Sequence, residues 1–522
     1  MVAGVELTYD RFASALQMAN AIFGNGVTVT GASFTGDVDG SAIYSDGDTI
    51  SPGVVPSDTG VILSTGDVRA FTSTGPESNV RSNTTTSNSG VNNETLFNAL
   101  AGQSTFDANY LEIEFTPDEG VNFITLEFVF SSEEYPEFAG SIYNDMVGIW
   151  IDNNPVPLAP GNGQASVGNI NSSGGINLFK SNTDDQVNTE MDGFTVSLSA
   201  TIPVTPETTN TLRIGVADVA DNQYDSNVLI AADSVQGTLV AVEDYVLLRP
   251  GDTENLDVLA NDLNLTGGAV FITHINDIPV SPGDSVTLNT GQTVTLSPFG
   301  TLQLTAADES EDVAFTYEIE STTGDTAVGF IIVDTVPCFV SGTLIRSEAG
   351  DVPVERLRVG QKVWTRDAGL QPIRWIGRRS LPAEGNMAPV RINAGTFGDH
   401  GVLMVSPHHR VIVNNAQAEL LCGTHEVLIA ARDLVDEKSV TRQMGGFVEY
   451  VHILFDAHQV VWSNGLLTES FLPGPQTTHC FDENCIAEIR TIFPELDPLT
   501  GAGYGPAARP ILKSYEARLL VA

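Results

Sequence analysis

The chain has little cysteine, few cations and no long apolar run. Four cysteines in 522 residues exclude a disulfide-stapled scaffold. No apolar stretch approaches the length of a membrane-spanning helix, so we expect no transmembrane segment. The first ten residues lack the basic and apolar segments of a secretion signal, and we expect no cleavable signal there.

Positive charge is scarcest in the first two thirds of the chain. Lys and Arg total 23 against 66 Asp and Glu, which gives a net charge of −43, and only six of the 23 precede Cys338. A polyanion of this kind repels DNA, RNA and anionic lipid, which excludes nucleic acid as a partner. An acidic folded region with so few cations needs solvent or bound cations, and Ca²⁺ suits carboxylate oxygens. Calcium is therefore the expected cofactor of this region.

The sequence is rich in patterns typical of strands. Hydrophobic residues make up 42%, and 49 Gly and 26 Pro are scattered among short Val, Ile, Thr and Phe runs. A chain of this length is expected to hold two to four domains. We predict a mostly β protein with a jelly-roll-like β-sandwich, a small second sandwich, an all-β third unit and a C-terminal extension. Their predicted bounds are 1–238, 239–335, 336–475 and 476–522.

Three local patterns make further predictions. Apolar residues at helical spacing, among them Phe12 and Leu16, predict an amphipathic helix over 7–23. Residues 72–93 are rich in Ser, Thr and Asn, which predicts an exposed and mobile loop. Residues 510–521 again show helical periodicity.

The second unit carries the phrase Leu-Ala-Asn-Asp at 259–262, after a strand-like stretch at 242–246. In these residues it resembles the bacterial cadherin-like and immunoglobulin-like repeats of large surface proteins. The resemblance implies a small sandwich that acts as a spacer and binds no ligand.

The third unit begins at Cys338 with residues that a chain needs to cut its own backbone. Such a reaction needs a nucleophile directly after the scissile carbonyl, and a thiol suits this role because a thioester is readily attacked again. It also needs a proton donor for the departing amine and hydrogen bonds to the strained carbonyl. Ser406 and His409 lie three residues apart at an expected turn between strands, so both can point into one pocket.

Four motifs then occur in a fixed order. They are Cys-Phe-x-x-Gly-Thr-Leu-Ile (338–345), Val-Glu-x-Leu-x-x-Gly (354–360), Ser-Pro-x-His-Arg-Val (406–411) and Ser-Asn-Gly-Leu (463–466). Together they are similar to the Hedgehog/intein (Hint) family over about residues 336–475, which implies an all-β Hint fold. The resemblance implies Cys338 as the nucleophile of an N-to-S acyl shift, His409 as the acid, and Ser406 where the family prefers Thr. His452 and His458 lie where the family places further polar groups.

Two departures from the family bear on the reaction. The His-Asn pair that ends an intein is missing from residues 466–471, which excludes splicing and leaves cleavage at Pro337–Cys338 alone. The attacked carbonyl belongs to Pro337, whose ring crowds the approach and predicts slow cleavage. The alternative is a folded but inert relative of the family. Cys480 and Cys485 match no zinc spacing, so a structural role is expected for them.

Two acidic loops lie between apolar strands in the first unit. A charge in such a place is costly unless it is paired or bound to a metal, and few cations are at hand. The candidate calcium ligands, which do not follow the EF-hand pattern, are Glu133, Glu134, Asp145, Asp218, Asp221 and Asp225. A solvated acidic rim is the alternative.

Two phrases in these loops carry another resemblance. Ser-Ser-Glu-Glu-Tyr at 131–135 and Asp-Ser-Asn-Val at 225–228 resemble the choice-of-anchor domains of bacterial surface proteins. The resemblance covers the first unit and implies an exported surface or matrix protein without known catalysis.

The expected protein is therefore a bacterial one at the cell surface or outside the cell, exported without a cleavable signal; a cytoplasmic location stays open. Its Hint domain is expected to act once as a cysteine autoprotease on its own chain, with no cofactor, and water or another nucleophile resolves the thioester. The expected partner of the acidic unit is a cell-surface or matrix ligand. The alternative function is calcium-dependent surface binding or adhesion with an inert Hint domain.

Overall fold

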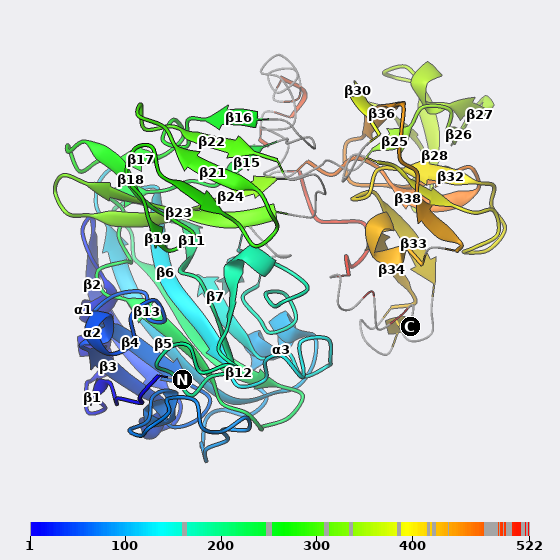
Figure 1. The fold of residues 1–522 in the computed structure, drawn as a ribbon. Helices are drawn as coiled ribbons and strands as arrows, with labels where there is room; N and C mark the ends of the chain where they lie inside the picture. The colour runs from blue at the N-terminus through cyan, green and yellow to red at the C-terminus, as the bar shows by residue number, and fades with distance from the viewer. Residues whose placement is uncertain are drawn as a thin grey trace. The chain divides into compact units, whose positions relative to one another are not determined.

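The computed structural model describes most of the chain. The described residues are 2–158, 164–246, 253–306, 313–333, 338–383, 388–414, 418–419, 424–436, 438–473, 489, 491–493, 495–496, 504–512, 517 and 520. Strands far outnumber helices in them, which confirms the mostly β class (Figure 1). The chain divides into two compact units, of which the first comprises Met1–Asp244, Glu254–Thr305 and Val313–Ile332, and the second is chiefly Val333–Ala522.

Two sheets form the N-terminal sandwich. The first has the strand order β1-β3-β4-β13-β6-β10-β9, with β11 also paired to β6. Its strands are β1 (Thr8–Asp10), β3 (Ser41–Ser45), β4 (Gly60–Ser64), β6 (Phe123–Ser132), β9 (Phe179–Ser181), β10 (Gly193–Thr195), β11 (Leu198–Pro203) and β13 (Ser226–Ala231). The second sheet has the order β2-β5-β12-β7-β8. Its strands are β2 (Val27–Thr35), β5 (Thr105–Pro117), β7 (Met146–Ile151), β8 (Asn154–Pro155) and β12 (Asn210–Val219).

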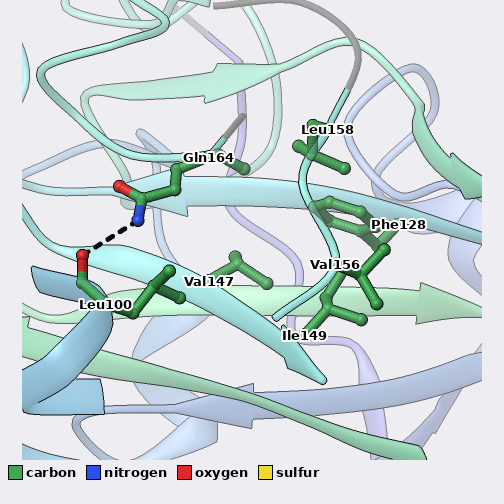
Figure 2. Close-up of a pocket in the computed structure, with 8 residues that line it drawn as sticks. Leu100, Phe128, Val147, Ile149, Val156, Leu158 and Gln164 are labelled. Atoms are coloured by element: carbon green, nitrogen blue, oxygen red, sulfur yellow. Dashed lines mark hydrogen bonds between the residues drawn. The ribbon is translucent and has the colours of Figure 1, made fainter. Parts of the chain in front are cut away.

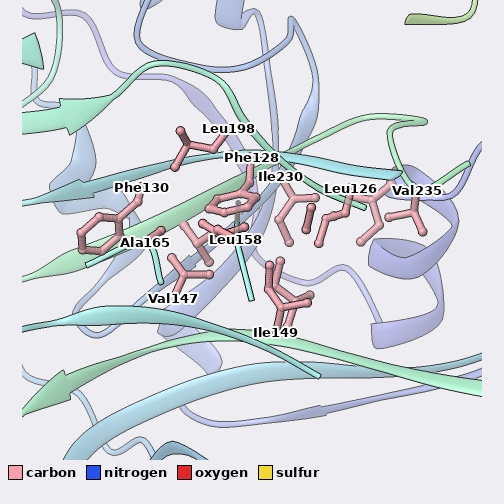
Figure 3. Close-up of a cluster of buried hydrophobic side chains, with 14 of the residues drawn as sticks. Leu126, Phe128, Phe130, Val147, Ile149, Leu158, Ala165, Leu198, Ile230 and Val235 are labelled. Carbon is pink, nitrogen blue, oxygen red and sulfur yellow. The ribbon is translucent and has the colours of Figure 1, made fainter. Parts of the chain in front are cut away.

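Alternate residues of the central strands meet in the core between these sheets (Figure 3). Leu126, Phe128 and Phe130 of β6 are fully buried, and Val147 and Ile149 of β7 join the same cluster. Because side chains alternate across a strand, each strand gives every second residue to this core. Full burial of a side chain of this size contributes roughly 1.5–3 kcal/mol, so the cluster holds the two sheets together.

The helix predicted over 7–23 is shorter than expected. Helix α1 spans Ala15–Ile22, because Ser14 and Gln17 form a capping box that fixes its first turn. The residues before it include β1, which pairs with β3, and Phe12 is 89% exposed. The prediction was therefore wrong for its first half. Among the described residues of this unit the other helices are α2 (Gly47–Ile50), α3 (Thr95–Ala101) and 3₁₀ turns at Val38–Gly40, Val68–Phe71 and Ile176–Leu178.

The Ser/Thr/Asn-rich segment 72–93 forms neither a helix nor a multi-residue strand, as predicted. It is not simply exposed, however, because Ser78 and Thr84 are buried. Backbone and hydroxyl groups of this segment donate hydrogen bonds to carboxylates of the sandwich, so the acidic residues hold it in place.

Residues 239–335 contain three small sheets, with the orders β14-β17, β15-β24-β23-β18-β19 and β16-β22-β21-β20. Their strands are β14 (Leu239–Val240), β15 (Asp244–Val246), β16 (Thr253–Leu256), β17 (Leu263–Asn264), β18 (Val270–Ile275), β19 (Ile278–Pro279), β20 (Ser285–Thr287), β21 (Thr293–Leu296), β22 (Leu302–Thr305), β23 (Val313–Ser321) and β24 (Thr326–Val333). Phe330 of β24 joins the core of the sandwich, and Lys180 pairs with Asp277 at 2.7 Å. This part of the chain thus packs on the sandwich; its predicted boundary at 238 and 239 stays a prediction.

Two sheets also build the C-terminal unit. One has the order β30-β36-β25-β32-β31-β35 and the other β27-β26-β28-β37-β38-β33-β34, with β29 paired to β28. The first comprises β25 (Phe339–Val340), β30 (Trp375–Pro382), β31 (Val390–Ile392), β32 (Leu403–Val405), β35 (Val440–Arg442) and β36 (Phe447–Leu454). The second comprises β26 (Leu344–Ser347), β27 (Gly350–Pro353), β28 (Lys362–Thr365), β29 (Gly369–Pro372), β33 (Arg410–Asn414), β34 (Glu426–Ala430), β37 (Val460–Ser463) and β38 (Leu466–Glu469), and 3₁₀ turns span Val354–Arg356 and Ala431–Leu434.

Several predicted features fall outside the described residues. They include Pro337, Cys480, Cys485, most of the extension 476–522 and most of the helix predicted over 510–521. In the part of the chain that the structure describes, no helix is both long and apolar enough to cross a membrane.

Candidate functional site

Cys338 lies directly before β25 and is almost fully buried. It belongs to an apolar cluster with Trp375, Tyr450 and Phe471. β25 pairs with β36 on one side and with β32 on the other. The residue that directly follows Cys338 is therefore held between two strands that lie far away in the sequence.

Ser406 contacts the backbone of Cys338 in both directions. The Cys338 N–H donates to Ser406 Oγ at 2.8 Å, and the Ser406 N–H donates to the Cys338 carbonyl at 3.0 Å. Ser406 follows β32, whose Val405 pairs with Phe339. The predicted turn thus brings a hydroxyl against the amide nitrogen that would leave during cleavage.

His452 is the side chain at the thiol. Its Nε2 lies 3.3 Å from Cys338 Sγ, and its ring packs edge-on against Phe471. His452 lies on β36 between Tyr450 and Leu454, which share its face of the strand and belong to the cluster around Cys338. An imidazole at this distance can accept the thiol proton.

His409 lies in the turn between β32 and β33, three residues after Ser406. Its N–H donates to the Ser406 carbonyl at 3.1 Å, and its ring centroid lies 4.4 Å from that of Phe339. Within the described residues neither ring nitrogen has a hydrogen-bond partner. Burial lowers the pKa of His409 to about 4, so its ring is neutral at neutral pH.

A buried ion pair that the sequence analysis did not name lies next to His409. Glu469, at the end of β38, is fully buried and accepts hydrogen bonds from the Arg410 N–H at 2.8 Å and from Arg410 Nη1 at 3.1 Å. Burial alone would raise the pKa of Glu469. The charge of Arg410 and a hydrogen bond from His458 outweigh burial and lower that pKa to about 2.

His458 belongs to this ion pair and not to the contact with the thiol. Its Nδ1 accepts the Ala508 N–H at 3.0 Å, so Nε2 carries the ring proton. Nε2 lies 3.3 Å from Glu469 Oε2 and 3.2 Å from the Ser470 carbonyl. The arrangement makes His458 a hydrogen-bond donor to Glu469. The position of Arg410 directly after His409 is the sequence feature that could have indicated this ion pair.

Of the six predicted calcium ligands, the structure brings three together. The Asp145 N–H contacts Glu134 Oε2 at 3.4 Å, and Asp145 lies close enough to Asp218 for its charge, together with burial, to raise the pKa of Asp218. Asp145 also accepts the Val219 N–H at 2.9 Å and the Ser226 hydroxyl at 2.7 Å. Neutral donors thus surround the Asp145 carboxyl group.

The other three candidates have separate partners. Glu133 accepts the Thr84 N–H at 2.9 Å, and Asp225 accepts the Thr86 N–H and hydroxyl at 2.8 and 2.6 Å. Asp221 accepts the Gln223 N–H within its own loop at 3.1 Å.

Burial governs the protonation of these groups. It raises the pKa of Glu133 to about 8 and that of Asp225 to about 6. Burial together with the charge of Asp145 also raises the pKa of Glu134 and of Asp218. A buried carboxyl without a cation holds its proton more tightly, because the neutral acid is cheaper to bury.

The fit of these residues to a metal is limited. Within the part of the chain that is described, Glu133 Oε2 and Asp218 Oδ1 are buried and have no hydrogen-bond partner, which leaves two oxygens able to meet a cation. Among the described residues, however, no three His, Cys, Asp or Glu side chains are arranged so that they could hold a metal ion. The arrangement does not fit a dedicated calcium centre, and calcium stays a prediction.

A cavity of about 10 Å³ lies in the sandwich beside Phe128 and Val147 (Figure 2). Gln164 Nε2 donates to the Leu100 carbonyl at its rim at 3.0 Å. Since one water needs roughly this volume, the cavity has no room for an organic ligand.

Comparisons with solved structures found small and distant likenesses. The crystal structure of the gp41-1 intein is 8% identical and covers 26% of this chain and 98% of its own, with a TM-score of 0.18. That of the MchDnaB-1 intein is 10% identical and covers 25% and 98%, also with a TM-score of 0.18. The eight N-terminal Ig domains of Down Syndrome Cell Adhesion Molecule are 8% identical and cover 57% and 30%, with a TM-score of 0.15. TM-scores this low carry no weight.

None of the curated proteins matches the chain. Two family models do match it, each over one part. The model of the choice-of-anchor L domain matches residues 8–236, and that of the Hint domain matches residues 337–475. These matches confirm two of the three resemblances found in the sequence: the chain carries a choice-of-anchor L domain followed by a Hint domain. The cadherin-like character of residues 239–335 stays a prediction.

Proposed function

We propose that the Hint domain cuts its own chain between Pro337 and Cys338 by an N-to-S acyl shift. The observation that carries the proposal is the 3.3 Å contact between Cys338 Sγ and His452 Nε2. On the other side of the same residue, Ser406 accepts the amide hydrogen. The nucleophile and the leaving nitrogen therefore each have a partner.

The reaction would run through a thioester. His452 accepts the thiol proton, and the thiolate attacks the carbonyl carbon of Pro337. The bond from that carbon to the Cys338 nitrogen then breaks, and the nitrogen takes a proton from the protonated form of His409 to become a free amine. The proton lost by sulfur is balanced by the proton gained by nitrogen.

The thioester is then resolved by a second nucleophile. Attack by water gives a Pro337 carboxylate and regenerates the Cys338 thiol. Attack by an external amine or hydroxyl would instead transfer the N-terminal fragment to that molecule. Splicing is not part of the proposal, because residues 466–471 offer no terminal Asn.

The N-terminal fragment would carry the choice-of-anchor L domain, and we propose an exported bacterial surface or matrix protein. The match to that domain and the high acidity support this location. A second candidate function is cation-dependent binding of a surface ligand with an inert Hint domain. The buried, unpartnered oxygens Glu133 Oε2 and Asp218 Oδ1 favour it.

Incubation of the purified chain with a thiol tests the first proposal. A thiol should release a fragment that ends at Pro337, because it attacks the thioester, and mass spectrometry identifies that end. Cys338→Ala should abolish the break, and His452→Ala should slow it by about 10²-fold or more, as expected for loss of a general base. His425→Ala is the matched control, since His425 is exposed and pairs with Glu419. A wild type that stays uncut, or a cut Cys338→Ala chain, would refute the proposal.

A further inference from the structure

Glu469 lies where it can act on His409 through the backbone. Its Oε1 accepts the N–H of Arg410, the residue that directly follows His409. The pairing of Val411 with Thr468 sets this register between β33 and β38. On the other side, the Ala431 N–H donates to the His409 carbonyl at 3.0 Å. The main chain around His409 is thus held from two directions, and the carboxylate provides one of them.

Glu469 also acts on His409 through its charge. Burial is the largest influence on the imidazole and opposes its protonated form, as do the nearby Arg410 and His458. Glu469 is the acidic neighbour, among the described residues, that favours the protonated form. A proton donor for a leaving amine has to carry its proton at the moment of transfer. The carboxylate therefore works against the three influences that would keep His409 neutral.

His458 donates a hydrogen bond that helps to keep this carboxylate charged. Its Nδ1 is engaged by the Ala508 N–H, which fixes the tautomer that donates from Nε2. Arg410 Nη1 completes the set of donors around Glu469. Three donors on a fully buried carboxylate hold it ionised and in one orientation.

Resting on the proposed self-cleavage, we propose that Glu469 is a positioning residue for this reaction. It fixes the backbone beside His409 and supplies the negative charge that lets His409 hold the proton destined for the Cys338 nitrogen. The roles then divide within one domain: His452 receives the proton of the thiol, and His409, supported by Glu469, gives one to the amine.

The substitution Glu469→Gln tests the proposal because it keeps an oxygen for the Arg410 N–H and removes the charge. The pKa of His409 should fall by about one unit or more, as expected when an opposite charge nearby is lost. The cleavage rate near neutral pH should then fall about tenfold, since the protonated fraction of His409 drops by that factor. The acidic limb of the pH–rate profile should move to lower pH by the same amount.

Glu426→Gln is the matched control. Glu426 also pairs with arginines of this domain, Arg366 and Arg509, each at 2.9 Å. Its substitution should leave the cleavage rate and the pH–rate profile unchanged. Titration of the His409 ring by NMR in full-length Cys338→Ala chains, with and without Glu469→Gln, gives a readout that does not depend on cleavage.

The outcomes separate the two proposals. A wild type that never cuts would refute the proposed function, while the NMR titration would still decide whether Glu469 acts on His409. A wild type that cuts while Glu469→Gln leaves both the titration and the pH–rate profile unchanged would overturn the role of Glu469. If Glu469→Gln fails to fold, Glu469→Asp replaces it: the charge stays and moves, so the rate should fall while the pH dependence is kept. An unchanged rate in a folded Glu469→Asp chain would also overturn the proposal.

Discussion

The choice-of-anchor L domain and the Hint domain both bury carboxyl groups, and they accommodate them in opposite ways. In the Hint domain Glu469 is paired with Arg410 and His458, and its pKa falls to about 2. In the choice-of-anchor L domain Glu133 is buried to a similar degree but meets the neutral N–H of Thr84. Burial then prevails and raises the pKa of Glu133 to about 8. One carboxyl stays ionised and the other keeps its proton.

The supply of cations explains this difference. Only six of the 23 Lys and Arg residues precede Cys338. With few cations available, hydroxyl and backbone donors of segment 72–93 serve the buried acids instead. A neutral acid or a hydrogen-bonded one costs less to bury than an unpaired charge. The same residue type thus takes part in a charged ion pair in one domain and in a neutral hydrogen-bond network in the other.

The comparison predicts opposite responses to pH, and this is the largest expected effect. Glu133 and Asp225 have raised pKa values in the folded state, so the folded state binds more protons than the unfolded one. Their contribution is complete below about pH 4 and is lost as pH rises through about 6 for Asp225 and about 8 for Glu133. Each unit of pKa difference is worth about 1.4 kcal/mol, so several such groups sum to several kcal/mol.

The Hint domain should respond in the other direction. The pKa of Glu469 is lowered to about 2 and that of His409 to about 4, so its folded state binds fewer protons than the unfolded one. Its stability is present at neutral pH and is lost as pH falls below about 6 through these two values. Calorimetry of Cys338→Ala at several pH values should show one unfolding transition for each domain. The two transition temperatures should shift in opposite directions as the pH changes. Transitions that shift in parallel would contradict the comparison.

Removal of one buried carboxyl from each domain should separate them next. Glu469→Ala leaves the Arg410 charge without its partner and should lower the free energy of unfolding by about 3 kcal/mol, because breaking a buried pair is costly. Glu133→Gln resembles the protonated acid and should change it by less than about 1 kcal/mol near pH 6. Denaturation followed by tryptophan fluorescence reports the first variant, because three of the four Trp residues follow Cys338. Equal losses would show that both carboxyls carry charge.

Removal of a hydroxyl that serves a buried carboxyl in place of a cation should have a moderate effect on stability. Thr86→Val removes the hydroxyl that donates to Asp225 Oδ2 at 2.6 Å and leaves a buried acceptor unmet. We expect a loss of about 1 kcal/mol in the free energy of unfolding of the N-terminal unit. Thr85→Val is the neighbouring control, since the Thr85 hydroxyl accepts the Tyr224 N–H at an exposed position. A loss confined to the control would count against the role given to segment 72–93.

Calcium should give the smallest effect, and one that depends on pH. Protons and cations compete for the same oxygens, so Ca²⁺ should raise the unfolding temperature more at about pH 9 than at about pH 5. The Glu133→Gln and Asp218→Asn variants should reduce that difference. They remove the charge from the two carboxyl groups that have a buried oxygen without a hydrogen-bond partner among the described residues. An effect that is equal at both pH values and in both variants would place any calcium elsewhere.

Much of the candidate site follows from local sequence. Ser406 and His409 share a four-residue turn between strands, and the motif around them predicts their proximity to Cys338. The position of His452 could not be derived in this way, because its contact with Cys338 spans 114 residues and depends on the pairing of β25 with β36. His458 was grouped with it, although the structure places that ring against Glu469.

The features that the sequence analysis missed depend on long-range pairing or on a single cap. The ion pair of Arg410 and Glu469 spans 59 residues and exists only because β33 pairs with β38. The first helix begins at Ala15 because Ser14 and Gln17 cap it, which the apolar periodicity of residues 7–23 did not show. Segment 72–93 looked exposed from its composition, yet buried carboxylates of the sandwich hold it.

Capture of the thioester is the most direct test of self-cleavage. Hydroxylamine attacks a thioester and would leave a hydroxamate at Pro337, whose mass differs from that of the free carboxylate left by an ordinary protease. The account predicts this hydroxamate on the N-terminal fragment of the wild type and no fragment from Cys338→Ala. A fragment with a free carboxylate that appears equally in both chains, or no fragment in either, would contradict it.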